Sequence, residues 1–216
     1  MGQIRAMHMT IPTPSTRKES ADATREAILH EAERVFAATG FSAARLEDIA
    51  DAVGIRRPSL LYHFSTKRML YDAVEQRLFE NMHEACEARI AGVEDPTARL
   101  LAHLDAWLDF FVSRPPAARI LQRLVADTAI RQDNPVEFSY VALEDMDRTL
   151  AYGIARGAFV PLSTMTFING VSAGILFFVC NGRQVGEQWR YEPSDPADLA
   201  VFRALLHKLA RSAVLP

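Results

Sequence analysis

Apolar residues recur at helical spacing along almost the whole chain. The segment 23–39 is the first example, and Gly40, a residue suited to a left-handed helix end, follows it. Its apolar face holds Ile28, Ala32, Val35 and Phe36. No stretch alternates convincingly between apolar and polar residues, as a half-buried strand would. The pattern therefore predicts an all-α protein.

Two short helices are expected after Gly40, followed by longer ones. The first short helix has the apolar positions Leu46, Ile49, Ala50 and Val53. Gly54 breaks that run, and Pro58 suits the first turn of the next helix. Proline, glycine, aspartate and asparagine then bound longer helices predicted over residues 66–91, 96–113, 116–133, 135–157, 163–181 and 196–214. Residues 1–19 lack periodicity and are expected to form a disordered arm.

Composition places the chain among ordinary globular proteins. Of the 216 residues, 49% are hydrophobic and 24% are charged, which excludes whole-chain disorder and a collagen-like fibre. Only two cysteines are present, Cys86 and Cys180, as is usual in a reducing compartment, so a cytoplasmic protein is expected. The longest apolar run, from Val171 to Cys180, is interrupted by Ser172 and Gly174, and we expect no membrane span.

Charge is unevenly distributed along the chain. The net charge is −3, yet the window from Ala52 to Leu70 contains no Asp or Glu. Its basic residues are Arg56, Arg57, Lys67 and Arg68. A short basic patch on an acidic body suits a small anion-binding domain, although four cations can also form a simple solvated face.

The basic patch lies within a recognisable supersecondary layout. The chain here has the arrangement of a helix-turn-helix. A helix of about eight residues is followed by a turn centred on Gly54 and by a short helix that Arg56 and Arg57 precede. An ordinary helical corner is the alternative. The spacing of the apolar residues Ile49, Val53, Ile55 and Leu60, together with the flanking cations, favours DNA binding.

A longer pattern extends this interpretation to a family. The characteristic positions are Gly40-Phe41, Leu46-Glu47-Asp48-Ile49-Ala50, Val53-Gly54-Ile55, Pro58-Ser59-Leu60 and Tyr62-His63-Phe64, with Lys67 and Leu70. In order and spacing, residues 24–74 resemble the DNA-binding domain of the TetR family of transcriptional regulators. The resemblance implies a helix-turn-helix domain over residues 20–66 and a larger helical domain for effector binding and dimerisation over residues 67–216.

Two positions depart from the family pattern. Arg45 stands where the family usually has a hydroxyl residue that caps the following helix; an arginine cannot accept the free helix N–H groups, but it can still bind phosphate. Leu61 stands where many members have a tyrosine, so the neighbouring Tyr62 is expected to take over that DNA contact.

Each residue of the patch can be given a role from its chemistry. Arginine matches the O6 and N7 acceptors of guanine, so Arg56 and Arg57 are the candidates for reading bases. Ser59 could contact either a base or a phosphate. The remaining candidates for phosphate contacts are Arg45, Tyr62, His63 and Lys67, with packing or helix capping as the alternative for His63.

In the larger domain, the family resemblance implies an effector pocket among the middle helices. The candidate lining residues are Phe79, Met82, Trp107, Phe110, Phe111, Arg123, Asp127, Phe138, Tyr140, Met146, Asn169 and Phe177. Plain core packing is the alternative for each aromatic residue. The aromatic and methionine side chains suggest a hydrophobic effector, with Arg123, Asp127 or Asn169 as its orienting groups.

The last two long helices carry broad apolar faces that are expected to pair two copies of the chain. The candidate interface residues are Val171, Ile175, Phe178, Phe202, Leu205 and Leu209. Packing within a single chain is the alternative. A homodimer would present two reading heads to a palindromic operator in double-stranded DNA.

The sequence thus predicts a repressor that a small hydrophobic effector releases from its operator. A DNA-binding protein without a ligand, acting as an activator or an architectural factor, is the alternative. An enzyme is a further alternative, but the sequence contains no phosphate-binding loop and no nucleophile motif. The six histidines also lack the spacing of metal ligands. We therefore expect no catalytic residue, metal or cofactor.

Overall fold

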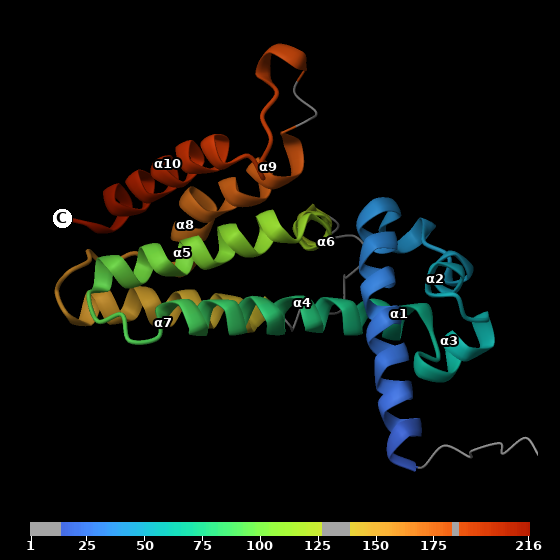
Figure 1. Cartoon of the computed structure of the whole chain (residues 1–216). Coiled ribbons are helices and arrows are strands. Elements are labelled where there is room, and N and C mark those ends of the chain that lie inside the picture. Colours follow the sequence, from blue (N-terminus) through green and yellow to red (C-terminus); the bar gives the residue numbers. More distant parts are fainter. Residues whose placement is uncertain (1–13, 127–138, 183–185) are drawn as a thin grey trace, which may run out of the picture.

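The computed structural model describes residues 14–126, 139–182 and 186–216, and the regular elements in these ranges are all helical. The chain forms a small head of α1 (Pro14–Ala43), α2 (Leu46–Val53) and α3 (Arg57–His63), attached to an elongated body (Figure 1). Helix α1 begins at Pro14, inside the segment 1–19 that was expected to be an arm; residues 1–13 lie outside the described ranges. The predicted all-α fold is confirmed.

Two glycines set the geometry of the head. Gly40 interrupts α1 with a φ of 79°, at the position where the sequence predicted the helix to end. Gly54 ends α2 in the left-handed conformation, with a φ of 76°, and donates its N–H to the carbonyl of Asp51 at 3.1 Å. A side chain other than glycine is strained at both φ values. Behind the turn, Ile49 and Leu60 are fully buried and hold α2 and α3 together.

The body contains the predicted long helices with nearly the predicted bounds. They are α4 (Lys67–Ile90), α5 (Pro96–Ser113), α6 (Pro115–Ala126), α7 (Tyr140–Ala155) and α10 (Pro196–Val214). Helices α4, α5 and α7 pack side by side, and α10 covers α5. The predicted helices over 116–133 and 135–157 reach into residues 127–138, which lie outside the described ranges.

The predicted helix over 163–181 is divided. It consists of α8 (Thr164–Phe167), a π-helical segment η3 (Ile168–Ser172) and α9 (Ala173–Asn181). A π-helical turn changes which side chains face each way, and the repeat of apolar residues does not reveal it. The stretch Thr164–Asn181 is long and apolar enough to cross a membrane, with 39% of it buried. Here it packs on α5, α6 and α10 as part of the helical body.

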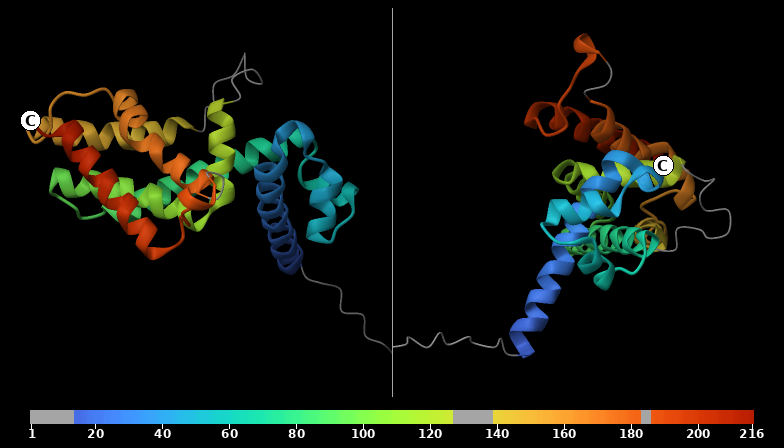
Figure 2. Two further views of the ribbon diagram at one scale, coloured as in Figure 1. Left: turned by 90° about the horizontal axis from the view of Figure 1, so that it is seen from above. Right: turned by 90° about the vertical axis from the view of Figure 1, so that its right-hand side faces the viewer.

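Helix α6 joins the head to the body by packing across α1. At the start of α6, the Arg114 guanidinium pairs with the carboxylate of Glu33 on α1, with Nε donating to Oε1 at 2.8 Å. Near its end, Arg123 donates to the carbonyl of Ala38 at 3.2 Å. The left view in Figure 2 shows the head standing clear of the rest of the body. The head can therefore respond to α4, which follows it in the chain, and to α6.

Candidate functional site

The first candidate site is the outer face of α3. Arg56, Arg57 and Ser59 are exposed, and Tyr62 is 85% exposed, whereas Leu60 and Phe64 on the opposite face are buried. This helix therefore presents cationic and hydrogen-bonding side chains outward on a rigid apolar base. Such a surface fits the major groove of DNA, which has room for a helix.

Arg57 is not free in this arrangement. Its Nε lies 3.1 Å from Oε1 of Glu47 on α2, and both side chains are about half exposed. Arg56, the residue before α3, has an extended backbone and caps the helix through its carbonyl, which accepts the N–H of Ser59 at 2.9 Å. Of the two predicted base readers, Arg57 would have to exchange Glu47 for DNA.

Lys67 is also engaged within the protein. Its ammonium donates to the carbonyls of Ser42 and Ala44 at 3.1 and 3.0 Å, and it lies 4.8 Å from the centroid of the Phe41 ring. It therefore fastens the end of α1 to the start of α4, where a cation meets unpaired helix carbonyls favourably. Binding a phosphate would add to this structural role.

The remaining predicted DNA contacts lie around the same surface. Arg45 is exposed and is the N-cap residue of α2 without a capping side-chain bond, as its chemistry predicted. His63 is half-buried with its ring edge-on to Tyr62, 5.5 Å between centroids, which agrees with a packing role. All seven predicted DNA-binding residues thus lie on or beside α2, α3 and the start of α4.

The second candidate site is a partly open cavity of about 330 Å³ in the body, and its lining includes the exposed residues Met165, Asn169 and Ala173. Of the residues predicted to line it, five do so: Phe79, Met82, Trp107, Phe111 and Asn169. Helix α6 adds Leu121, and α7 adds Ala142 and Leu143. The remaining wall comes mainly from α8, η3 and α9, including Met165, Ile168, Ser172, Ile175 and Leu176. The cavity is therefore predominantly apolar.

Several predicted lining residues lie elsewhere. Arg123 points to α1, because its guanidinium donates a hydrogen bond to the α1 backbone. Its Nη1 lies so close to Gly40 that a Cβ added there would be only 3.0 Å away. Phe110 packs edge-on against Phe111 and under Arg114, while Met146 is fully buried in the core. Tyr140 and Phe177 are exposed on the surface instead. The predicted residues Asp127 and Phe138 lie outside the described ranges.

The sequence analysis missed the wall formed by α8, η3 and α9. A partial signal was present, since Met165, Asn169, Ser172 and Leu176 recur at spacings of three and four residues. The helix is apolar on nearly every side, however, so this periodicity could not show which side faces a cavity.

A buried histidine lies directly behind one wall of the cavity. His103 stacks edge-on against Trp107, 4.9 Å between centroids, and its Nδ1 lies 3.0 Å from Oγ1 of Thr149. Because the Thr149 hydroxyl donates to the carbonyl of Asp145, its oxygen accepts from His103 Nδ1–H. The other nitrogen, Nε2, has no hydrogen-bond partner among the described residues. Burial lowers the pKa of His103 to about 4, and the charges of Arg99 and Arg148 add to the shift.

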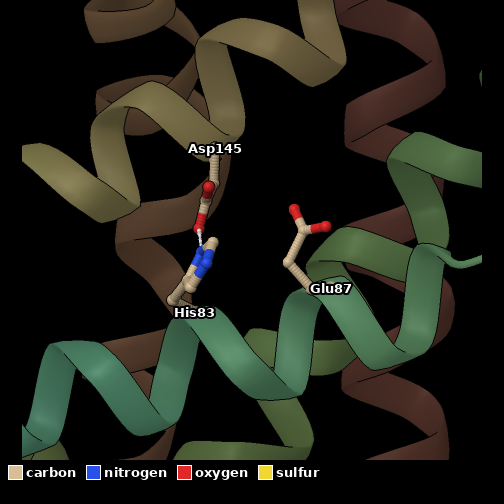
Figure 3. A group of neighbouring side chains, drawn as sticks. All are labelled: His83, Glu87 and Asp145. Atoms are coloured by element: carbon tan, nitrogen blue, oxygen red, sulfur yellow. Dashed lines mark hydrogen bonds and ion pairs between the residues drawn. The ribbon is translucent and has the colours of Figure 1, made fainter.

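A cluster of polar residues joins α4 to α7 (Figure 3). His83 and Glu87 rise from α4 toward Asp145 of α7, and His83 Nδ1 lies 2.7 Å from the Asp145 carboxylate. Their potential ligand atoms lie within 4.8 Å of one another, close enough to hold a metal ion. The Arg148 guanidinium, however, contacts Asp145 and also lies 3.4 Å from Glu87, so both carboxylates already have a cation. The cluster is accounted for as an ion-pair clamp between the two helices.

The predicted dimer interface is only partly on the surface. Val171, Ile175 and Phe178 are buried inside the chain's own body, and this corrects their assignment as interface residues. Phe178 instead stacks on Phe202, 4.1 Å between ring centroids. The apolar side chains that face outward form a group that we name the outer stripe: Phe177 of α9 with Val201, Leu205 and Leu209 of α10.

The comparisons with known proteins agree with this geometry. Residues 28–74, which hold α2, α3 and the start of α4, match the family model "Bacterial regulatory proteins, tetR family". The chain belongs to the TetR family. This match confirms the prediction of a helix-turn-helix transcriptional regulator rather than an enzyme. It agrees with the exposed position of α3 among the described residues.

Named relatives extend the similarity beyond the head. The transcriptional activator FasR of Mycolicibacterium smegmatis is 37% identical over 89 residues, which is 41% of each chain. The transcriptional repressor NicS of Pseudomonas putida is 29% identical over 106 residues, covering 49% of this chain and 50% of NicS. The chain thus spans about half the length of these relatives or less, so they do not establish its targets.

The similarity of fold covers nearly the whole molecule. A TetR-family transcription regulator from Marinobacter aquaeolei superposes on 92% of this chain and 98% of its own with a TM-score of 0.75. The sequence identity is 18%, so this likeness concerns the fold alone. It includes the helical body as well as the head.

Proposed function

We propose that this TetR-family protein is a cytoplasmic repressor that binds a palindromic operator as a homodimer and leaves it when a small hydrophobic effector enters the cavity. The chain divides functionally into a DNA-binding domain over residues 20–66 and an effector-binding and dimerisation domain over residues 67–216. The observation that carries this proposal is that two helices serve both sites. Helices α4 and α6 line the cavity and also hold the head.

On DNA, α3 enters the major groove with its exposed face. Arg56 and Arg57 read bases, Ser59 contacts a base or a phosphate, and Tyr62 donates to the backbone. Arg45, His63 and Lys67 contribute phosphate contacts around the edge of this surface. Arg57 exchanges its exposed ion pair with Glu47 for guanine acceptors, and this exchange is cheap because exposed pairs contribute little stability.

The outer stripe is the surface through which two copies pair. Its α10 members, Val201, Leu205 and Leu209, are spaced one helical turn apart and lie on one exposed face. Phe177, which is 61% exposed, extends the apolar surface onto α9. Burying these side chains against their copies gives an isologous interface.

The effector acts through the shared helices. Phe79 and Met82 of α4 and Leu121 of α6 line the cavity. Arg114, which directly precedes α6, and Arg123 of α6 contact α1 of the head. An effector that fits the cavity only after α4 and α6 shift also changes the spacing of the two heads. A 100-fold preference for the shifted state amounts to about 2.7 kcal/mol, which is enough to empty an operator of moderate affinity.

Activation is the second candidate for the direction of regulation. The relative FasR carries the name of an activator and is 37% identical over 89 residues. A dimer with the same DNA-binding and effector sites can activate when its operator lies where it assists the polymerase. The two directions are distinguished by measuring transcription from the selected operator in a reconstituted system with and without the protein.

Selection of binding sites by the full-length protein tests the proposal. A random duplex pool should yield one palindromic sequence whose half-sites lie about 34–36 Å apart. The double variant Arg56→Ala/Arg57→Ala should lose this selection. Arg211→Ala removes a matched exposed arginine of α10, far from α3, and should keep it. Failure to enrich any sequence over random competitor would overturn the proposed function.

A further inference from the structure

The π-helical segment η3 brings polar groups to an otherwise apolar cavity. Asn169 and Ser172 both belong to η3 and both line the cavity. In a regular α-helix a serine hydroxyl commonly bonds to a carbonyl of the preceding turn. Ser172 is buried, yet its Oγ has no hydrogen-bond partner among the described residues. An unsatisfied buried hydroxyl in a cavity wall is a group that a ligand can satisfy.

The charge of the cavity wall restricts which ligands can enter. Among the described residues, the cavity is lined by apolar side chains and by the uncharged polar residues Ser139, Asn169 and Ser172. Arg123 of α6, which the sequence suggested as an orienting group, is turned toward α1. An ionised group that enters as far as the buried Ser172 would lose its hydration without gaining an opposite charge from the described lining residues, which is strongly unfavourable.

The size of the cavity sets the dimensions of the ligand. Its volume of about 330 Å³ is roughly twice that of an engineered apolar cavity of about 150 Å³ that accepts benzene. Much of the wall consists of the flat rings of Phe79, Trp107 and Phe111. The flexible side chains of Met82 and Met165 also contribute. Two fused rings or an alkyl chain of about ten carbons matches this space, and the methionines can adjust to either.

We infer that the effector is an electrically neutral molecule with an apolar body of this size and one hydroxyl or carbonyl group that hydrogen-bonds to η3 through Ser172 and Asn169. The inference rests on the proposed function, because it assigns the ligand class of the same cavity. It distinguishes neutral alcohols, ketones and esters from fatty-acid anions and from amines of equal length.

Three probes with the same tail test the charge requirement: 1-decanol, decanoate and decylammonium at pH 7.5. Trp107 lines the cavity and Trp189 is exposed, so in Trp189→Phe the remaining tryptophan reports binding by fluorescence. Decanol should bind at least tenfold more tightly than either ion. Leu143→Phe, which narrows the cavity, should weaken decanol binding at least fivefold, whereas Val141→Phe on the exposed side of α7 should not. Equal or tighter binding of decanoate would overturn the inference.

Ser172→Ala tests the hydrogen bond with two readouts of opposite sign. Removing an unsatisfied buried hydroxyl should raise the melting temperature of the ligand-free protein, because nothing bonded is lost. The same change should weaken decanol binding about three- to tenfold. Ser212→Ala, on the exposed part of α10, should change neither quantity. Unchanged decanol affinity in Ser172→Ala would contradict the assigned contact.

Operator binding by the ligand-free protein is measured in the same preparations. If the operator is bound but none of the decyl probes binds the cavity, the inference fails while the DNA-binding function stands. If decanol binds selectively but no operator is selected, the proposed function fails and the ligand class stands. The two failures are therefore distinguishable.

Discussion

Arg114 at the start of α6 holds Glu33 of α1 by two contacts, one from Nε to Oε1 at 2.8 Å and a second from Nη2 to Oε2. Glu33 is only 3% exposed, and Arg77 of α4 also approaches its carboxylate, at 3.5 Å. One buried carboxylate thus ties together the head and the two helices that line the cavity. We therefore expect a movement of α6 to reach α1 through this contact.

Arg114→Met should therefore destabilise the protein by about 2–3 kcal/mol, because the Glu33 carboxylate loses a charged hydrogen-bond partner while still buried. Urea unfolding measures the loss. The double variant Glu33→Gln/Arg114→Met should recover part of the stability, since no uncompensated charge remains. A loss below about 0.5 kcal/mol for Arg114→Met would show that Arg77 alone is a sufficient partner for Glu33.

His103 predicts a pH dependence of stability. Its pKa is about 4 in the folded protein against an ordinary value of 6.5, so the unfolded chain binds more protons in that window. Its contribution is fully present above pH 6.5 and is lost as the pH falls toward 4. Between pH 7.5 and 5 the loss amounts to about 2 kcal/mol.

Urea unfolding at the two pH values checks this expectation, with His103→Leu as the comparison. The variant lacks the titrating group, so the fall in its free energy of unfolding between pH 7.5 and 5 should be about 2 kcal/mol smaller than in the unchanged protein. An equal pH dependence in both proteins would assign the acid sensitivity to other groups.

Most helix bounds and the helix-turn-helix head could be read from the sequence, whereas the cavity wall and the outward-facing apolar side chains could not. Proline and glycine mark the ends of α4 and α5, so the predicted 66–91 and 96–113 differ little from Lys67–Ile90 and Pro96–Ser113. Helix α9 is apolar all round, and periodicity therefore could not tell Ile175, which faces the cavity, from Phe177, which faces outward. The Arg123 position depends on packing between α1 and α6, which are distant in sequence.

The outer stripe predicts the effect of charge on assembly. Leu205→Arg places a cation in the middle of the proposed self-complementary surface, where it would face its own copy across the two-fold axis. Sedimentation should then show a monomer, with operator affinity reduced at least 100-fold because a single head binds weakly. Val141→Arg puts the same charge on exposed α7 and should leave the dimer intact. A dimeric Leu205→Arg protein would place the interface elsewhere.

The ion pair between Arg57 and Glu47 predicts that substituting either residue changes operator binding, and that the two substitutions act in opposite directions. Arg57→Ala should cost about 1–3 kcal/mol on the selected operator and relax the preference at one base pair, because a bidentate contact to guanine is lost. Glu47→Gln removes the competing carboxylate, 3.1 Å from Arg57 Nε, and should tighten operator binding without changing the preferred sequence. Lys67→Met should instead weaken binding to all sequences alike and also lower stability, because this lysine fastens α1 to α4. Fluorescence anisotropy with the operator and with single-base variants separates these effects. An equal loss on every sequence for Arg57→Ala would mean that Arg57 contacts phosphate and that Arg56 alone reads the base.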